Sequence, residues 1–303
     1  MNLLTTSNKY VRSPLRYPGG KQKSISFLSK VINGFKERYG FNEFRDPFLG
    51  GGSVSLYALS MNLAEIYWAN DANESLMDFW MQAQEDVNAL CDMVESLKEP
   101  YEGSRKKSPQ WTRFRVKYTK KLQSLPSDRL SRAARFFILN RSTSSGSTES
   151  GGMTPLAYCE RFTESSIQRL RLLDSQLKNI FFSCHDYKSL LEGSGSNVFI
   201  FLDPPYFSAE NSGLYGKNGN LHKGFDHFKL AENLRNCSHH WLMTIDNFHQ
   251  INQLYQGWTS TVAWRKAYGM TNVNGAKSKI GSELLVANFD LEPFLLNEKD
   301  LEY

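Results

Sequence analysis

The sequence predicts an α/β fold: a Rossmann-like mixed sheet of about seven strands that carries a mainly helical insertion. Three observations predict it. Short β-rich runs alternate with helical patterns in the first and last thirds of the chain, which is typical of parallel strands joined by helices. The middle, roughly residues 75–176, contains no convincing strand. Two final β-rich runs, about 259–266 and 283–289, predict a terminal antiparallel hairpin.

The composition is that of a globular protein, with 303 residues of which 40% are hydrophobic and 22% are charged. No apolar run reaches 18 residues, so we expect no transmembrane helix and no membrane partner. The amino-terminal residues lack the features of a signal peptide, and the four cysteines are scattered. The sequence therefore favours a cytoplasmic location and argues against a disulfide framework or a metal site.

Positive charge is concentrated in one stretch of the chain. Between Lys98 and Lys121 there are nine Lys or Arg residues against two Glu, within a chain of net charge +5. A local excess of this kind indicates a polyanion partner, although a solvated helix face would give the same pattern.

The first motif is a Pro18-Gly19-Gly20 turn before a helix that we expect from Ser24 to about Tyr39. The turn exposes backbone N–H groups beside Lys21, which suits a carboxylate or a phosphate. A P-loop ATPase would need Gly in place of Leu15 and Ser or Thr in place of Gln22, so that class is nearly excluded.

A short strand, a glycine loop at Gly50–Gly52 and a helix start come next. The glycines let the backbone approach a ligand closely, and Ser53 is expected to cap the helix. A second strand, residues 65–71, ends at Asp71, which lies 19 residues after Gly52. An acidic residue at this spacing is the usual partner of ribose hydroxyls in nucleotide-type sites. Asp71 could instead cap the helix predicted over about 73–97.

The middle of the chain reads as helices over about 73–97, 109–124 and 127–140, followed by a long polar loop, Ser142–Gly152. Arg129, Arg132 and Arg135 recur every three residues and form a one-sided basic stripe. We interpret residues 76–176 as an inserted helical DNA-recognition subdomain, and residues 1–75 and 177–303 as the domain that holds the sheet.

Two further strands end in polar residues. Residues 179–184 lead to His185-Asp186-Tyr187, and residues 197–202 lead to Asp203-Pro204-Pro205-Tyr206. Ligands bind beyond the carboxyl ends of strands in an open α/β sheet, so a substrate is expected there. Asp-Pro is also a common strand stop, and these four residues alone leave both interpretations open. Residues 207–224 read as a lid, and a strand at 241–245 leads to the terminal hairpin.

Together these motifs resemble the Dam-type family of DNA N6-adenine methyltransferases, over about residues 9–290. The family often has an aromatic residue where Ser144 stands. The segments that carry the resemblance are Leu15-Arg16-Tyr17-Pro18-Gly19-Gly20-Lys21, Asp46-x-Phe48-x-Gly50-x-Gly52-Ser53, Asn70-Asp71, Leu139-Asn140-Arg141…Gly146, Asp203-Pro204-Pro205-Tyr206 and Ser282-Glu283-Leu284-Leu285-Val286.

The resemblance implies S-adenosylmethionine as cofactor and Asp203, Pro204, Pro205 and Tyr206 as the catalytic turn. It places Lys21 near the methionine carboxylate, Asp71 at the ribose, and Asp186 or Tyr187 beside the cofactor's adenine. The residues expected to bind the cofactor are Tyr17, Lys21, Asp46, Phe48, Gly50, Gly52, Ser53, Asp71, Asp186, Tyr187 and Asp203. Those expected to bind DNA are Arg113, Arg115, Lys117, Arg132, Arg135, Asn140, Arg141, Lys277 and Lys279.

The function expected is methyl transfer to N6 of an adenine that is flipped out of double-stranded DNA. Asp203 and the Pro204 carbonyl would accept the two amine hydrogens while Tyr206 stacks on the base. No metal is required. We expect a monomer, with a cognate restriction endonuclease as a genetic partner. The alternatives are methylation of cytosine N4 or of RNA adenine by the same fold, and a DNA-binding homologue without catalysis.

Overall fold

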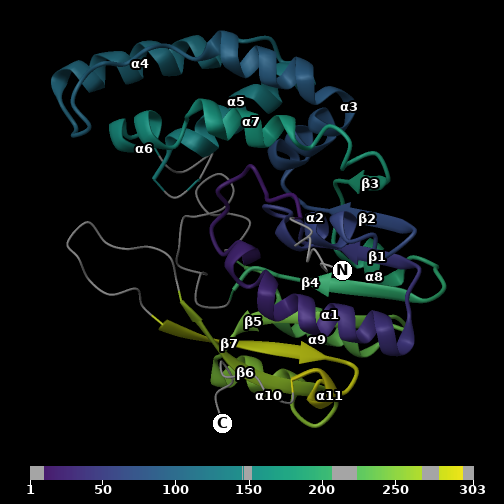
Figure 1. Ribbon diagram of the computed structural model, residues 1–303. Coiled ribbons are helices and arrows are strands. Elements are labelled where there is room, and N and C mark those ends of the chain that lie inside the picture. The colour runs from purple at the N-terminus through teal and green to yellow at the C-terminus, as the bar shows by residue number, and fades with distance from the viewer. Residues whose placement is uncertain (1–9, 145, 147–151, 207–223, 268–279, 296–303) are drawn as a thin grey trace, which may run out of the picture.

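The computed structural model describes residues 10–144, 146, 152–206, 224–267 and 280–295 (Figure 1). Its centre is a seven-stranded sheet with the order β3-β2-β1-β4-β5-β7-β6, which confirms the predicted fold class. The strands are β1 Glu43–Asp46, β2 Ile66–Asn70, β3 Ile180–Ser183, β4 Val198–Leu202, β5 His240–Asp246, β6 Ser260–Ala267 and β7 Ile280–Ala287.

Strands β1 to β5 are parallel, and β7 pairs antiparallel with both β5 and β6. The chain builds β1, β2 and β3 outward in one direction and then returns to place β4 on the other side of β1. The strand order therefore reverses between β1 and β4. Ligands of open α/β sheets bind at the carboxyl ends of the strands beside such a reversal.

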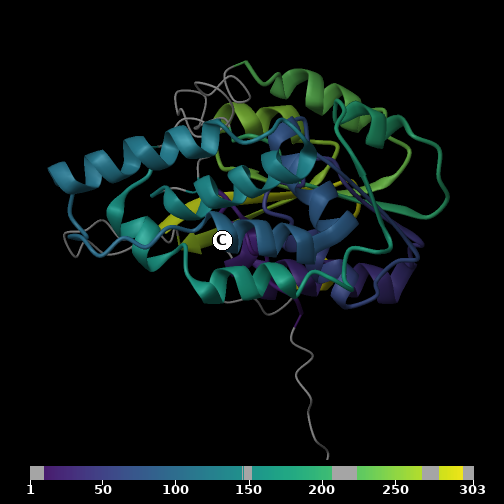
Figure 2. The same ribbon diagram turned by 90° about the horizontal axis from the view of Figure 1, so that it is seen from above.

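Helices cover both faces of the sheet. In Figure 2 the purple helix α1 lies on one side of the strands and the green helix α9 on the other. Strand β4 is buried on both faces, because Phe199 and Phe201 enter one apolar core while Val198, Ile200 and Leu202 enter a second. The elements that flank the sheet are η1 Lys21–Lys23, α1 Ile25–Tyr39, α2 Ser53–Ser60, α8 Lys188–Glu192, α9 His227–Arg235, α10 His249–Tyr255 and α11 Glu292–Leu295.

The chain between β2 and β3 is helical, and we call this stretch the helical part. Helix α3 packs against α5 and α7, and α5 packs against α6. The starts of four of these helices follow from capping chemistry, because the side chains of Asn73, Ser108, Asp128 and Thr154 each accept a hydrogen bond from a backbone N–H in the first turn. The helices are α3 Glu74–Leu97, α4 Pro109–Gln123, α5 Arg129–Ser142, α6 Pro155–Glu160 and α7 Glu164–Arg171.

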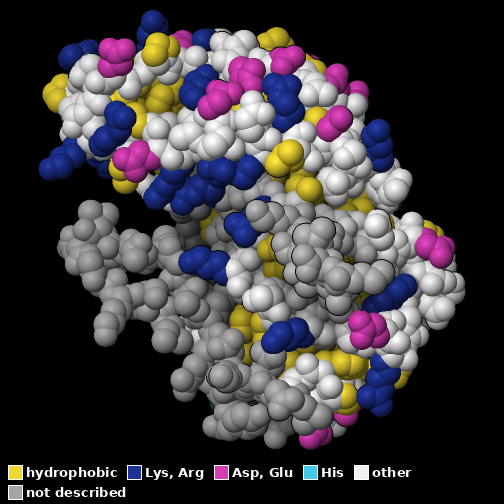
Figure 3. Space-filling view, viewed as in Figure 1, with side chains coloured by type: hydrophobic (Ala, Val, Ile, Leu, Met, Phe, Trp, Pro, Cys, Tyr) yellow, Lys and Arg dark blue, Asp and Glu magenta, His cyan; other side chains and the backbone are white. Residues whose placement is uncertain are grey.

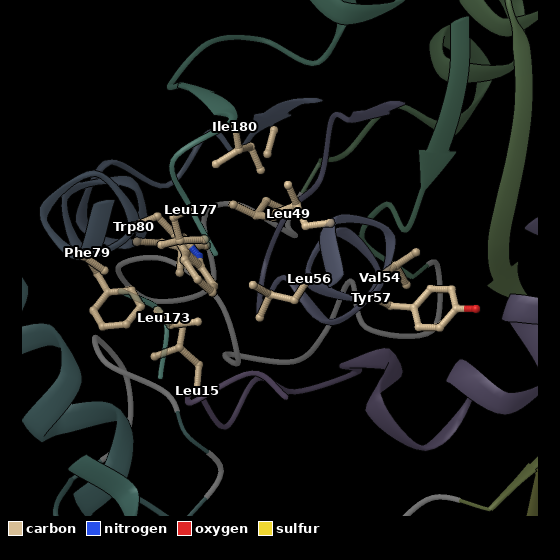
Figure 4. Packing of buried hydrophobic residues seen from close by; sticks show 14 of the residues in the cluster. Leu15, Leu49, Val54, Leu56, Tyr57, Phe79, Trp80, Leu173, Leu177 and Ile180 are labelled. Atoms are coloured by element: carbon tan, nitrogen blue, oxygen red, sulfur yellow. The ribbon is translucent and has the colours of Figure 1, made fainter. Parts of the chain in front are cut away.

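The helical part and the sheet share one continuous apolar core. Trp80 of α3 lies near Leu49 and Leu177, and Leu15 of the amino-terminal segment approaches Leu173 (Figure 4). The Trp80 ring also stacks on Phe182 of β3, with ring centroids 6.1 Å apart. Helix α3 therefore belongs to both parts through its buried side chains.

No helix among the described residues has both the length and the apolar character that a bilayer crossing needs. The lid expected over 207–224 lies outside the described residues except for Gly224, and so do the hairpin loop over 268–279 and most of the polar loop after Ser144.

Candidate active site

The ends of β1 and β2 are joined by hydrogen bonds at the carboxyl edge of the sheet. The Gly50 N–H donates to Asp71 Oδ2 over 2.9 Å, and the Leu49 N–H donates to the Asn70 carbonyl over 2.8 Å. Asn70 is fully buried, and its amide nitrogen donates to the Pro47 carbonyl at 3.2 Å and to the His185 carbonyl at 2.9 Å. One buried amide thus fixes the loops that follow three neighbouring strands.

The glycine loop is closed by two aromatic rings. Gly50 has a φ of +48°, and a Cβ atom there would lie 2.8 Å from the Tyr17 ring. Gly52 has a φ of +67°, and a Cβ atom there would lie 2.8 Å from the Trp80 ring. Both the backbone conformation and the space therefore require glycine. The expected cap by Ser53 is wrong: Gly52 is the N-cap residue, and no side chain caps α2.

Two acidic residues lie in the floor of the site. Asp46, at the end of β1, is 3% exposed, and its Oδ2 accepts a 2.6 Å hydrogen bond from the Ser55 hydroxyl while Oδ1 has no partner among the described residues. Burial raises the pKa of Asp46 to about 7; the Ser55 hydrogen bond opposes this shift, and the nearby charge of Asp203 adds to it. Burial also raises the pKa of Asp71, against the hydrogen bonds from Asn73 and Gly50.

Asp203 follows β4 directly and is held from two sides. Its Oδ1 lies 2.5 Å from the Lys21 ammonium and accepts a 3.0 Å hydrogen bond from the Thr244 hydroxyl of β5. Lys21 is 2% exposed, and its ammonium lies 4.9 Å from the centroid of the Tyr206 ring. The second carboxylate oxygen, Oδ2, accepts no hydrogen bond from any residue that the structure describes. The carboxylate of Asp203 is therefore oriented through Oδ1, and Oδ2 is left able to accept a hydrogen bond.

Three aromatic rings gather beside this edge of the sheet. Phe48 stacks on Tyr187 with centroids 5.2 Å apart, and Phe225 packs edge-on against Phe48 at 5.7 Å. The Tyr187 hydroxyl accepts a 3.0 Å hydrogen bond from the Asn233 amide, so α9 helps to position that ring. Asp186 is exposed, and its carboxylate accepts a 2.9 Å hydrogen bond from the Lys188 N–H.

Most of the residues expected to bind the cofactor thus gather at one edge of the sheet, with their cofactor roles still predictions. Lys21 contacts Asp203, a partner that the sequence motifs did not anticipate. The sequence did not predict three further residues that lie at this edge of the sheet, namely Asn70, Thr244 and Phe225. Thr244 had one available signal, because it lies two residues before Asp246, where a predicted strand ends.

The residues expected to bind DNA fall into three groups. Arg113 and Lys117 are exposed on α4, and Arg115 and Arg135 are half-buried. Lys and Arg side chains also line the margin of the helical part that faces the sheet (Figure 3). Lys277 and Lys279 lie outside the described residues.

The remaining three members have protein partners. Arg132 binds both carboxylate oxygens of Asp78, at 2.6 and 3.0 Å. Asn140 is fully buried, and Arg141 is 8% exposed and donates to the main-chain oxygens of Pro14 and Arg161. Their observed contacts are structural, and contact with DNA stays a prediction for them.

Comparison with known proteins gives three similarities. The chain is 23% identical to the type II methyltransferase M.MjaIII of Methanocaldococcus jannaschii, over 92% of this chain and 99% of that protein. It is 25% identical to the modification methylase StsI of Streptococcus sanguinis, over 98% of this chain but only 46% of that longer protein. Among solved structures, a SAM-dependent methyltransferase from Agrobacterium tumefaciens aligns with 88% of this chain and 61% of its own, at 10% identity and a TM-score of 0.39.

The family model described as D12 class N6 adenine-specific DNA methyltransferase matches residues 17–270, most of the chain. That span includes the glycine loop, the helical part and the Asp203 turn. The match favours DNA adenine as the substrate over cytosine N4, RNA adenine or a homologue without catalysis. The methyl donor of the family is S-adenosylmethionine. The chain belongs to the D12 class of N6 adenine-specific DNA methyltransferases.

Proposed function

We propose that the chain methylates an adenine flipped out of duplex DNA, and that Asp203 orients the target amine. The observation that carries this proposal is the asymmetry of the Asp203 carboxylate. Lys21 and Thr244 both bind Oδ1, at 2.5 and 3.0 Å. Oδ2 is left as an acceptor at the carboxyl end of β4, beside the point where the strand order reverses. Since an adenine stacked in a duplex cannot reach a recessed acceptor, the base must leave the helix.

The residues around the glycine loop fit S-adenosylmethionine. Gly50 and Gly52 let the Tyr17 and Trp80 rings pack against the loop backbone and fix its shape, and Asp46 retains one buried acceptor oxygen. We assign Tyr17, the glycine loop and Ser53 to the body of the cofactor, Asp71 to the ribose, and Phe48, Tyr187 and Asp186 to its adenine. S-adenosylmethionine supplies, when bound, a methyl group on a positively charged sulfur.

The chemistry required of the protein is to make the amine nucleophilic. The N6 lone pair is delocalised into the adenine ring, and acceptors placed against the two amine hydrogens favour a tetrahedral nitrogen whose lone pair is available. Asp203 Oδ2 and the Pro204 carbonyl supply these acceptors, and Pro205 removes a competing N–H donor. Tyr206 stacks on the flipped base. The nitrogen gains a methyl group and loses one proton, which the Asp203 carboxylate can accept.

The deciding experiment is Asp203→Ala measured in two assays. Methyl transfer to DNA should be lost, while titration with S-adenosylmethionine should give an affinity close to that of the wild type. Wild-type turnover by the variant would refute the assignment of Asp203. Loss of cofactor binding together with methyl transfer would instead assign Asp203 to the cofactor site.

We further propose that the protein acts as a cytoplasmic monomer beside a cognate restriction endonuclease. The names of the similar proteins, a type II methyltransferase and a modification methylase, support the link to restriction. Sequencing of methylated positions in DNA from cells that express the chain should reveal one short target. Cleavage of unmethylated DNA at that target by an extract of the source cells would identify the nuclease, and sedimentation would test the monomer.

A further inference from the structure

A cluster of four arginines lies where the amino-terminal segment meets the helical part. Arg16 precedes the glycine turn, Arg141 lies near the end of α5, Arg161 follows α6, and Arg169 lies in α7. Figure 1 shows the purple segment before η1 rising toward the helical part. Asn140 fixes this approach, because its side chain accepts from the Arg16 N–H and donates to the Arg16 carbonyl, both over 2.9 Å.

Two of these guanidinium groups meet at one oxygen atom. The Ser144 carbonyl accepts hydrogen bonds from Arg16 Nη2 at 3.0 Å and from Arg161 Nη1 at 2.7 Å. Arg16 also donates to the Thr143 carbonyl over 3.0 Å. Both arginines are half-buried and Ser144 is exposed, so the pair lies at the surface. A carbonyl oxygen carries only partial negative charge and cannot neutralise two cations.

Arg141 is buried beside the pair and binds the backbone of both segments that carry it. It is 8% exposed, and it donates to the Arg161 carbonyl at 2.9 Å and to the Pro14 carbonyl at 3.3 Å. Its guanidinium therefore holds both chain segments that carry the surface pair. Burial, followed by the charges of Arg169, Arg16 and Arg161, lowers the pKa of Arg141 to about 10.

Within the part of the chain that the structure describes, no acid compensates the charge of this cluster. None of the four arginines forms an ion pair with a carboxylate of the described residues, whereas Arg129, Arg132 and Arg171 of the same helical part all do. Burial lowers the pKa of Arg16 to about 10, and the nearby charge of Arg161 adds to the shift. Partly buried like charges cost free energy, and an anion that bridges them would recover it.

We propose that Arg16 and Arg161 bind a backbone phosphate of the DNA close to the flipped adenine, with Arg141 and Arg169 adding to the positive field. The proposal rests on the proposed function, which brings DNA to this edge of the sheet. Arg16 adjoins Tyr17, which packs on the glycine loop, and lies five positions before Lys21, which binds Asp203. A phosphate suits the site better than a base edge. It carries a full negative charge, whereas the carbonyl oxygen that the two guanidinium groups share carries only a partial one.

The test compares three variants that each remove one positive charge: Arg16→Gln, Arg161→Gln and, as the matched control, Arg171→Gln. Affinity for two unrelated duplexes of equal length is measured at several salt concentrations between about 50 and 200 mM. Each cluster variant should bind both duplexes more weakly by the same factor and should lower the slope of log affinity against log salt by about one. The control should retain the wild-type slope, because Arg171 is paired with Asp92 and Glu95.

Two readouts keep the outcome decisive. Arg161→Gln leaves the main-chain oxygen that Arg141 binds, so this variant should fold even if Arg16→Gln does not. Its cofactor affinity without DNA should match the wild type. If its salt slope equals that of the control, or if it alters only the set of sequences methylated, the phosphate site is refuted. The proposed function is tested separately, by assaying adenine methylation with the wild-type protein. That result does not depend on whether the variants change the slope of log affinity against log salt.

Discussion

The Lys21 ammonium and the Asp203 carboxylate lie 2.5 Å apart although the two residues are separated by 182 positions in the chain. Lys21 lies in η1, at the start of the sheet region, and Asp203 follows its fourth strand. Their side chains are 2% and 20% exposed, so the pair has little access to water. The pair therefore joins the amino-terminal segment to the turn that follows β4.

Removing one member of this pair should destabilise the protein more than removing both. Lys21→Met leaves a partly buried carboxylate without its cation, and the free energy of unfolding should fall by about 3 kcal/mol. Lys21→Met combined with Asp203→Asn should recover part of that loss, because no unpaired charge remains. Chemical denaturation of the four proteins measures the coupling. Strictly additive effects would mean that the two groups do not stabilise one another.

Thr244→Val should lower kcat without altering cofactor affinity. The Thr244 hydroxyl donates to Asp203 Oδ1 and helps to orient the carboxylate. A lost hydrogen bond to a charged group costs about 1.5–3 kcal/mol, which corresponds to about a 10- to 100-fold reduction in rate. Thr244→Ser keeps the hydroxyl and should retain most of the activity. A valine variant with the wild-type kcat would show that Lys21 alone positions Asp203.

Gly50→Ala should weaken binding of S-adenosylmethionine by about tenfold or more, since it adds both backbone strain and a clash with the Tyr17 ring. Gly257→Ala is the matched control, because Gly257 has a φ of +85° but open space around a Cβ atom. The control shares the strain without the clash and should bind the cofactor normally. Equal losses in both variants, by isothermal titration, would trace the effect to stability alone.

The free energy of unfolding should decrease as pH rises from about 4 to about 7. The pKa of Asp46 is near 7 in the folded protein, and an unfolded Asp titrates near 3.9. Within this window the folded state binds the extra proton, so raising the pH favours the unfolded state. Asp46→Asn should flatten this part of the stability profile, and an unchanged profile would rule out a shifted Asp46.

Replacing Arg113 and Lys117 with Gln should weaken DNA binding for all sequences alike, because both side chains are exposed cations on α4. Arg115, half-buried on the same helix, should contribute less. Lys121→Gln is the matched control, since that ammonium is paired with Glu99 at 2.8 Å. Binding assays with several duplexes measure the effect. A change in sequence preference at constant affinity would assign these residues to base recognition.

The fold could be predicted closely because its signals are local. The seven strands are short β-rich runs, and helices α3, α4 and α5 begin at residues with capping side chains, Asn73, Ser108 and Asp128. The expectation for Ser53 failed for a physical reason. Gly52 adopts a left-handed conformation that starts α2 without a side-chain acceptor, and the sequence alone did not reveal which of the two would be the N-cap.

Sequence motifs selected residues that the structure brings to one edge of the sheet, but they did not predict how these residues contact one another. Spacing placed Asp71 beside the glycine loop, and the Gly50–Asp71 hydrogen bond agrees with that placement. The partners of Lys21 and Arg132 depend on distant residues, Asp203 and Asp78, that no periodicity or motif connects to them. Side-chain pairs between residues far apart in the chain could therefore not be predicted from the sequence.

The double hydrogen bond between the Asn140 side chain and the Arg16 backbone has a practical consequence for protein engineering. A chimera that exchanges only residues 76–176 between relatives would cut this connection, and it would also separate Trp80 from the glycine loop whose Gly50 carbonyl it binds. Grafts intended to alter the target sequence should therefore carry residues 14–17 and the glycine loop Gly50–Gly52 from the same donor as α3.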